Sequence, residues 1–385
     1  MRLVVCASHP IQYQAPMFRE LAKRVELLVL YAARANPSDA NDGFFVDIDW
    51  DVDLLEGYES RFLTNVSARP GIDHFGGCDT PGIGAILRSG GFDAVLLLGW
   101  HLKFFHQALI AAKLARIPVL QRGDSHLGTP RSAAKRAIKR IAYPPFLRLF
   151  DAALAVGRNS RDYWLHYGYP ESRIFFAPHG IDETFFRERA TPEARSAFRA
   201  GLEAEPDETL LLFVGKLGPK KRPADLLAAT ARLRQDGRRV RAVFAGSGPL
   251  EQELASQARA DAVPVAMLGF RNQSEMPAIY AGSDMLVLTS SNETWGLVAN
   301  EALGCGRPLV LSDSVGSAPD LVGDGIAGRS YPVGDIGALT NAIAALIDCP
   351  PAGSALAGKA ARYSVSTAAD GVLEAMSSVQ RATSS

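Results

Sequence analysis

Short apolar runs alternate with longer segments of helical periodicity along the whole chain. Residues 93–100, DAVLLLGW, are almost continuously apolar, which is typical of a parallel strand buried on both faces. Runs of the same kind predict further strands at 3–7, 25–31, 118–127, 151–157, 210–214, 240–246, 285–289 and 309–312. We find no sequence repeat with a period of about 20 to 50 residues. The pattern therefore predicts an α/β protein with two doubly wound domains.

Two segments have a weaker pattern. Residues 44–63, FFVDIDWDVDLLEGYESRFL, alternate partly with a period of two, which predicts strands but indicates no chemistry. Residues 355–380 predict a terminal helix, followed by a disordered tail of small polar residues.

Polar residues gather in the stretch 283–323, where strands are predicted to end. Glu293 follows the strand at 285–289, and Glu301 lies in the short helix after it. Ligands of open α/β sheets bind at this edge. Residues 290–292, Ser-Ser-Asn, offer helix caps. Glu301 falls on the apolar face of its helix and needs a partner. That partner is either a pair of ligand hydroxyls or a Lys or Arg of the protein, in which case Glu293 caps the helix.

The run SSNETWGLVANEALGCGRPLVLSDSVGSAPDLV resembles the donor-site signature of retaining, GT-B-fold glycosyltransferases of family 4. The resemblance covers most of the C-terminal half and implies two Rossmann-like domains facing a central cleft. It places Glu293 beside the hydroxyls of the donor sugar and Glu301 on the ribose hydroxyls. The residues between them that it implies for donor binding are Thr294, Trp295 (in place of the more usual Phe), Gly296, Leu297 and Val298.

The loop after the strand at 210–214 supplies cations. Gly215, Lys216 and Lys221 match the glycine, basic residue and lysine pattern of the same family, whereas a Walker A loop would have Ser or Thr after the lysine. By resemblance the two lysines hold the donor diphosphate, which gains negative charge as the glycosidic bond breaks. The alternative is a charged turn exposed to solvent. Phe270 and Arg271 fall where the family binds the nucleotide base.

The first half offers candidates for the acceptor side. His9, Gln12 and Tyr13 lie in the turn after the first strand, which is glycine-rich in many relatives, and His101 follows the strand at 93–100. The alternative for the first three is local hydrogen bonding within the turn.

A denser polar cluster ends the strand at 118–127. Family members place a histidine there, near the reacting sugar carbon. Here either Asp124 replaces that histidine, or the loop is rephased and His126 takes the role. Arg122 is a further acceptor-side candidate. The alternative for the cluster is a strand-end cap or an internal salt bridge between Arg122 and Asp124.

Residues 131–142, RSAAKRAIKRIA, predict an amphipathic basic helix that Pro144 and Pro145 end. Such a helix suits an anionic membrane surface or an acidic acceptor. A solvated face is the alternative.

Composition narrows the classes of function. The chain has 385 residues with 41 basic and 41 acidic side chains, so no overall charge favours nucleic acid as a partner. Its four cysteines are widely spread, which favours reduced thiols over disulfides or a metal site. The first apolar run is too short for a secretory signal, and no apolar stretch reaches the roughly 18 residues of a membrane span. We expect a cytoplasmic protein, with peripheral contact to the inner face of the cell membrane as an option.

These observations lead to one hypothesis about function and two alternatives. The chain is expected to transfer a sugar from a nucleotide-diphosphate donor to a sugar or lipid-linked acceptor with retained configuration, in polysaccharide, lipopolysaccharide or glycolipid biosynthesis. By resemblance it needs no metal and no cofactor. The alternatives are an inactive GT-B scaffold that binds nucleotide sugar, and another GT-B enzyme such as a phosphorylase or sugar-nucleotide epimerase. The expected domains are 1–186, a linker at 187–208, 209–354, and a helix within 355–385 that crosses back to the first domain.

Overall fold

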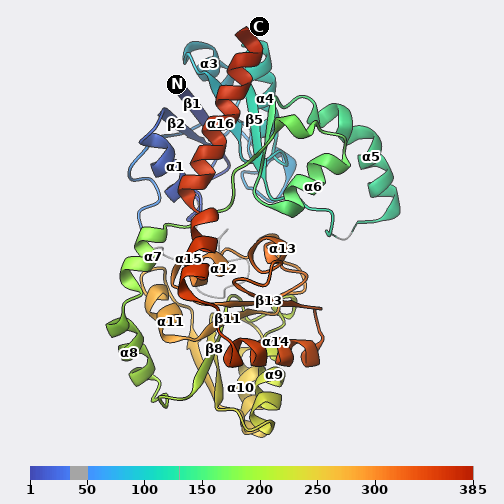
Figure 1. The fold of residues 1–385 in the computed structure, drawn as a ribbon. Coiled ribbons are helices and arrows are strands. Elements are labelled where there is room, and N and C mark those ends of the chain that lie inside the picture. Colours follow the sequence, from blue (N-terminus) through green and yellow to red (C-terminus); the bar gives the residue numbers. More distant parts are fainter. Residues whose placement is uncertain (35–50, 130, 385) are drawn as a thin grey trace. The chain divides into compact units, whose positions relative to one another are not determined.

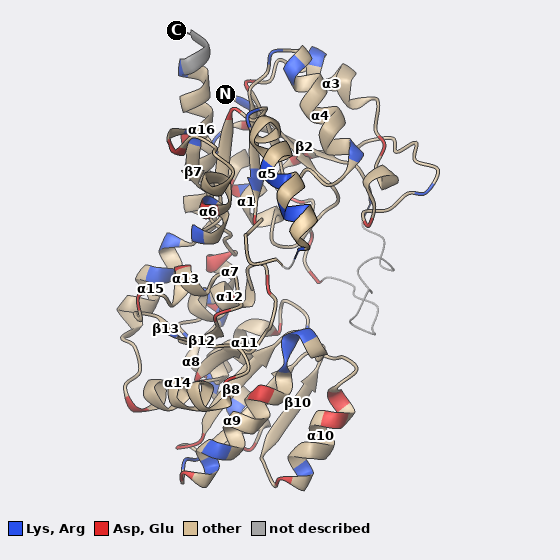
Figure 2. Cartoon of the chain, turned by 90° about the vertical axis from the view of Figure 1, so that its right-hand side faces the viewer, with Lys and Arg blue, Asp and Glu red and all other residues tan. Residues whose placement is uncertain are grey.

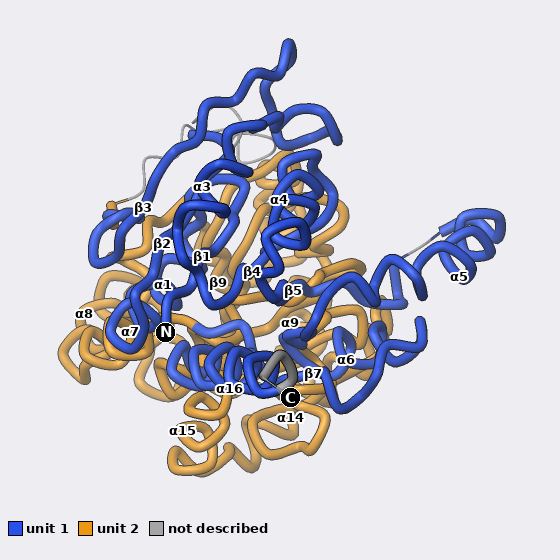
Figure 3. Tube along the Cα trace, turned by 90° about the horizontal axis from the view of Figure 1, so that it is seen from above, with its two compact units in different colours: residues 1–39, 53–180, 364–385 blue, residues 40–52, 181–363 orange. Residues whose placement is uncertain are grey.

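The computed structural model describes residues 1–34, 51–129 and 131–384, and it divides into two compact units. Unit 1 comprises residues 1–39, 53–180 and 364–385, and unit 2 comprises 40–52 and 181–363 (Figure 3). Of the strands predicted within 44–63, residues 44–50 lie outside the described part of the chain.

Unit 1 is built on a seven-stranded parallel sheet of order β3-β2-β1-β4-β5-β6-β7 (Figure 1). Its strands are β1 (Arg2–Ala7), β2 (Glu26–Tyr31), β3 (Glu59–Phe62), β4 (Ala94–Leu97), β5 (Val119–Gly123), β6 (Ala152–Ala155) and β7 (Ile174–Phe176). Its helices are α1 (Ala15–Ala22), α3 (Ile83–Ser89), α4 (Lys103–Leu114), α5 (Ala133–Leu147), α6 (Arg158–His166) and α16 (Val365–Ser384).

Alternate residues of the strands of unit 1 enter two separate cores. Val4 and Cys6 pack on the side covered by α3, α4 and α6, whereas Leu3 and Val5 pack on the side covered by α1 and α16. This separation follows from the period of two in a strand. Gly371 lets α16 lie directly on the sheet, because a Cβ there would come within 1.9 Å of the Phe176 carbonyl oxygen. The last helix of the chain therefore completes a core begun by the first strand.

Unit 2 has a six-stranded parallel sheet of order β10-β9-β8-β11-β12-β13. Its strands are β8 (Thr209–Val214), β9 (Val240–Ala245), β10 (Val265–Gly269), β11 (Met285–Leu288), β12 (Leu309–Ser312) and β13 (Gly328–Tyr331). Its helices are α7 (Glu183–Arg189), α8 (Pro192–Gly201), α9 (Pro223–Gln235), α10 (Glu251–Ala260), α11 (Met276–Gly282), α12 (Val298–Gly304), α13 (Ala318–Leu321), α14 (Ile336–Asp348) and α15 (Gly353–Arg362).

Both sheets have the strand order of a doubly wound fold, so the prediction of two such units is confirmed. Helices α9, α10 and α14 pack on one face of the second sheet, while α12 contacts β11 and β12. The stretch expected as a linker, 187–208, contains α8, which packs against α11. The terminal helix predicted over 355–380 is two helices, because α15 ends at Arg362 and α16 begins at Val365.

The basic helix differs from its prediction at its end. Pro144 and Pro145 lie inside α5, which continues to Leu147. A proline removes one hydrogen bond to the carbonyl four residues before it, here those of Arg140 and Ile141. Both of those residues are exposed, so water can take the place of the missing donors.

Among the described residues, no helix is both long and apolar enough to cross a bilayer.

Candidate functional site

The order of the strands in unit 2 brings two predicted loops together. The chain winds outward in opposite directions from β8 and β11, which are neighbours in the sheet. The loops after such a pair border the crevice in which doubly wound folds bind ligands. The loop after β8 carries Gly215, Lys216 and Lys221, and the loop after β11 carries Glu293. Sequence reasoning named these residues from separate motifs, and the fold places them at one site.

Hydrogen bonds to the main chain hold the two loops against each other. The Thr289 hydroxyl donates to the carbonyl oxygens of Lys221 and Arg222, at 2.7 and 2.8 Å. The Ser291 amide donates to the Lys220 carbonyl at 2.8 Å. Because these bonds hold the backbones of the two loops together, they help to position the side chains of Lys221 and Glu293. Sequence reasoning assigned no role to Thr289.

Lys221 Nζ forms an ion pair with Glu293 Oε2. Both side chains are partly buried, 30% and 20% exposed, and each belongs to a different loop of the switch point. The positive and negative candidates of the predicted donor site are therefore in direct contact.

Glycines shape the loop that carries Glu293. Gly296 has φ +88°, a conformation that glycine adopts without strain. The Gly316 amide donates to the Glu293 carbonyl at 2.9 Å. A Cβ on Gly316 would lie 1.8 Å from the carbonyl oxygen of Thr294. The small-residue turn after β12 thus packs directly on the loop that carries Glu293.

Glu301 is buried, with 4% of its surface exposed, and accepts a 2.7 Å hydrogen bond from the Tyr280 hydroxyl. Its observed partner is a tyrosine on α11, not a Lys or Arg. Burial raises the pKa of the Glu301 carboxyl to about 7, and the hydrogen bond from Tyr280 acts in the opposite direction. No local pattern in the sequence pointed to Tyr280, because the contact depends on how α11 packs against α12.

The start of α12 differs from its prediction. The helix begins at Val298 with Leu297 at the N-cap and has no side-chain cap. The polar residues at 290–292 therefore do not cap it, and neither does Glu293. The Ser291 hydroxyl instead donates to the Lys220 carbonyl at 3.1 Å, which again ties the two loops together.

The remaining donor candidates differ in how open they are. Thr294 is exposed, whereas Leu297 and Val298 are partly buried. The Trp295 indole is 4% exposed and donates to Asn300 Oδ1 at 2.9 Å, so this side chain supports the loop from inside. Arg271 forms an ion pair with Glu275 at 2.8 Å beside Phe270, at the end of β10.

In unit 1, the loops after β1 and β4 border the corresponding switch point. His9 Nδ1 lies 3.0 Å from the Ser8 hydroxyl oxygen, which fits the local bonding expected as an alternative for this turn. Gln12 is buried and Tyr13 partly buried. His101 follows β4, and burial lowers its pKa.

The polar cluster after β5 does not form the Arg122–Asp124 salt bridge that was one of its alternatives. Arg122 is buried and donates to the carbonyl oxygens of Ala177 and Pro178, at 3.0 and 2.6 Å. Asp124 lies 3.8 Å from His179 Nε2, a contact between the ends of β5 and β7. His126 contacts the Thr129 hydroxyl at 3.4 Å.

His179 is the residue in this cluster to which the sequence assigned no role. It lies in the Pro-His-Gly turn after β7. Burial lowers the pKa of His179. Burial acts to raise the pKa of Asp124, but the hydrogen bond and charge of His179 lower it overall. The hydrogen bond with His179 therefore favours the ionised form of Asp124.

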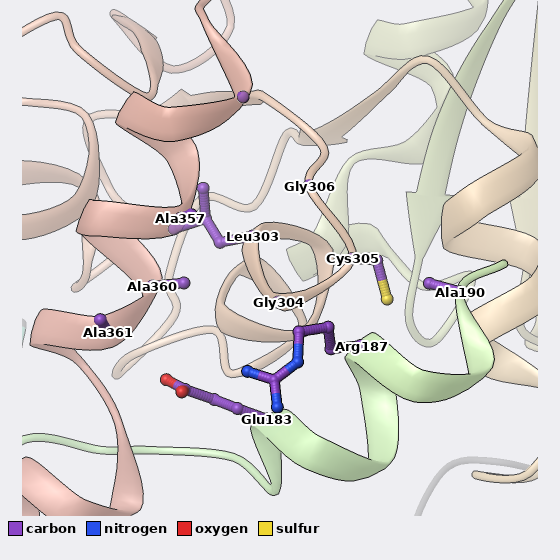
Figure 4. Close-up of a pocket in the computed structure, with 11 residues that line it drawn as sticks. Glu183, Arg187, Ala190, Leu303, Gly304, Cys305, Gly306, Ala357, Ala360 and Ala361 are labelled. Carbon is purple, nitrogen blue, oxygen red and sulfur yellow. The ribbon is translucent and has the colours of Figure 1, made fainter.

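A separate pocket of about 460 Å³ lies in unit 2 between α7, the C-terminal end of α12 and α15 (Figure 4). Its polar side chains include Glu183 and Arg187, and Cys305 also lines it. None of the predicted donor-binding residues is among the residues that line this pocket.

Metal independence stays a prediction. Aspartates alternate at 47, 49, 51 and 53, and the first two lie outside the described residues. In the described part of the chain, no group of three or more His, Cys, Asp or Glu side chains is arranged to hold a metal ion.

Comparisons with known proteins agree with this architecture. Residues 194–363 match the family model "Glycosyl transferases group 1". D-inositol 3-phosphate glycosyltransferase of Mycobacterium sp. (strain KMS) is 35% identical over 189 residues, 47% of this chain and 41% of that protein. The protein of the same name from Rhodococcus opacus (strain B4) is 30% identical over 299 residues, 71% of this chain and 62% of that protein. The matches thus cover roughly half of these relatives.

Solved structures extend the likeness over both units. HepE of Anabaena, crystallised with UDP, has a TM-score of 0.73 at 21% identity, covering 98% of this chain and all of that chain. A glycosyltransferase of Rickettsia africae ESF-5 has a TM-score of 0.74 at 13% identity, covering 98% of each chain. At such identities the likeness concerns the fold. Residues 194–363 thus match the glycosyl transferases group 1 model, and the chain as a whole shares its two-sheet fold with these solved structures.

Proposed function

We propose that this chain is a retaining glycosyltransferase of family 4 that transfers a sugar from a nucleotide-diphosphate donor to a hydroxyl acceptor. The observation that carries the proposal is the contact between Lys221 and Glu293 across the switch point of unit 2. It joins a lysine, a type of side chain that binds phosphate, to a glutamate, a type that binds sugar hydroxyls. Both residues lie in the part of the chain that matches the family model.

The ion pair suggests how donor binding prepares the site. A diphosphate carries more negative charge than one carboxylate and competes for Lys221. When Lys221 turns to the phosphate, Glu293 is released to accept hydrogen bonds from sugar hydroxyls. As the glycosidic bond breaks, charge grows on the leaving diphosphate, and Lys221 and Lys216 stabilise that charge more than they stabilise the ground state.

Glu301 is assigned to the ribose hydroxyls. Hydroxyl donors favour the ionised form of a carboxyl group, and the pKa of Glu301 lies at about 7 before any ligand binds. Binding of a nucleoside is therefore expected to release a proton near neutral pH and to strengthen as the pH rises.

Only the relatives narrow the choice of donor and acceptor molecules. UDP and UDP-glucose are named for HepE, so a UDP-sugar is the donor we would try first. The relatives named for D-inositol 3-phosphate and the lipopolysaccharide galactosyltransferase WaaB suggest phosphorylated or lipid-linked acceptors. We place the reaction in polysaccharide, lipopolysaccharide or glycolipid assembly, without a metal.

A peripheral membrane contact through residues 131–142 forms part of the proposal, together with a cytoplasmic location. Ile138 and Ile141 on α5 are 65% and 80% exposed and lie among Lys and Arg residues. This combination suits the surface of an anionic bilayer.

The experiment combines binding and turnover. Thermal unfolding is measured with UDP, GDP, ADP and their sugars for the wild type, Glu301→Ala and Lys221→Ala. A nucleotide at about 100 times its Kd should add roughly 2.7 kcal/mol of stability. The anomeric configuration of the product, read by NMR, tests retention. If no nucleotide stabilises the wild type, the donor-site assignment fails. Binding without turnover for any acceptor favours the inactive scaffold.

A further inference from the structure

A second pocket lies wholly in unit 1, beside α5. It has a volume of about 580 Å³ and is lined by the loop after β5, by α5 and by the end of α6. Pockets of about 300 to 1,000 Å³ are of the size that holds small organic ligands. The residues on which the argument rests are Thr129, Arg131, Arg136, Arg140, His166 and Tyr167.

The charge around this pocket has one sign. Between Asp124 and Asp151 the sequence has Lys or Arg at 131, 135, 136, 139, 140 and 148, and neither Asp nor Glu. Figure 2 shows Lys and Arg residues along α5. The ion pairs formed by Asp124 and Asp151 are with His179 and Lys113. Among the described residues, no carboxylate lies within ion-pair distance of Arg131, Arg136 or Arg140.

The position of the arginines is unfavourable without an anion. Arg136 and Arg140 are four residues apart on α5, where like charges face each other and destabilise the helix. Arg131 lines the same pocket from the preceding loop. Lys139, by contrast, is engaged inside unit 1, since its Nζ lies 3.2 Å from the Tyr163 hydroxyl and above the Tyr143 ring. Three arginines thus line one pocket, and no carboxylate of the described chain pairs with them.

Packed aromatic rings form the side of the pocket behind these cations. Tyr167 is buried and packs against the rings of Tyr143 and Tyr163, with centroid distances of 5.1 and 5.0 Å. Because these packed rings restrict changes in the shape of the pocket, recognition depends on the shape of the ligand as well as on its charge.

We propose that this pocket binds the phosphoryl or diphosphoryl group of an organic ligand. Guanidinium groups bind phosphate oxygens through paired N–H donors, and three of them balance a group with two to three negative charges. The pocket is larger than a bare phosphate needs, which leaves room for the rest of the ligand. The ligand is either water-soluble or a lipid headgroup, and the same arginines serve both.

The test uses two double variants with equal loss of charge. Arg136→Gln with Arg140→Gln removes two cations that line the pocket. Lys135→Gln with Arg148→Gln removes two exposed cations nearby that do not line it. Calorimetry measures the binding of inorganic pyrophosphate, and sedimentation measures binding to phosphatidylglycerol vesicles, with phosphatidylcholine vesicles as the uncharged reference.

We expect the pocket variant to raise the Kd for pyrophosphate at least about tenfold and the control variant to change it less than about twofold. If only vesicles bind, with the same difference between variants, the phosphoryl group belongs to a lipid. Equal losses in both variants would mean diffuse attraction by α5 and overturn the proposal, as would absence of binding by the wild type to either probe.

Lys221→Ala separates this site from the proposed donor site, which also attracts phosphate. Binding lost only in Lys221→Ala would assign the pyrophosphate to unit 2 and overturn the pocket. Because nucleotide-induced stabilisation is measured separately, the donor site and this pocket can fail independently.

Discussion

Lys221 reaches the carboxylate of Glu293 from a loop that follows a different strand, and the Thr289 hydroxyl holds the backbone carbonyl of Lys221. The contact is possible because β8 and β11 are neighbours in the sheet, although 70 residues lie between the end of β8 and the start of β11. A lysine already held by a carboxylate is presented to an incoming diphosphate in a restricted geometry.

Replacing Lys221 by Ala should reduce turnover far more than stability. An electrostatic group that acts in the transition state contributes about 10²- to 10³-fold in rate. A partly exposed ion pair contributes only about 0 to 1 kcal/mol to unfolding. Steady-state kinetics and urea unfolding of Lys221→Ala measure the two effects. The neighbouring Lys220→Ala, whose side chain is exposed, serves as the control. Equal rate losses in both variants would contradict a specific role for Lys221.

Glu301 should make the stability depend on pH in an unusual direction. Its folded-state pKa of about 7 lies above its ordinary value near 4.5. Between these two pH values the folded chain therefore keeps a proton that the unfolded chain has released. Wild-type stability should therefore fall as the pH rises from about 4.5 to 7, by an amount on the order of 3 kcal/mol relative to Glu301→Gln.

Urea unfolding of the wild type and Glu301→Gln at several pH values isolates this contribution, because all other groups titrate alike in both. Tyr280→Phe removes a bond that lowers the pKa and should move the window to higher pH. A constant difference between the wild type and Glu301→Gln from pH 4.5 to 8 would rule out this titration.

Gly316→Ala should damage both the fold and the donor site. The new Cβ would collide with the Thr294 carbonyl, and relieving the collision moves the loop that carries Glu293. We expect a loss of about 2 to 3 kcal/mol in unfolding free energy and a weaker nucleotide-induced shift. Gly353→Ala, with open space around its Cβ position, should cost little. Wild-type stability in Gly316→Ala would show that the close approach is not required.

Asp124→Asn should reduce sugar transfer without affecting donor binding. Asp124 pairs with His179 in unit 1, whereas the nucleotide candidates belong to unit 2. Turnover should fall at least about tenfold, while the nucleotide-induced thermal shift stays within error. His179→Asn, which removes the imidazole but keeps a polar side chain, shows whether the effect depends on the Asp124–His179 pair or on Asp124 alone. A lost nucleotide shift in Asp124→Asn would contradict this division of roles.

Local pattern was sufficient for most strands of the two sheets and for the loops that carry Lys221 and Glu293. Continuous apolar runs identified β4 (Ala94–Leu97), β11 (Met285–Leu288) and β12 (Leu309–Ser312) to within a few residues, because strands buried on both faces must be apolar throughout. The strand order then followed the rules of doubly wound folds.

Contacts between distant segments could not be predicted in the same way. The partner of Glu301 is Tyr280, and that of Asp124 is His179. Neither pair has a fixed spacing in sequence, so each depends on the packing of whole elements. The continuation of α5 through Pro144 and Pro145 also escaped prediction, because the carbonyls that lose their donors are exposed, where water can bond to them.

Helix α16 has a consequence for synthesis. Unit 1 needs residues 364–385, which the ribosome makes after all of 181–363. At about 5 to 20 residues per second, the nascent first sheet waits roughly 10 to 40 s with the face that α16 covers still open. The part of the chain that emerges first is thus the last to close its core, and in this interval a chaperone has an apolar surface to hold.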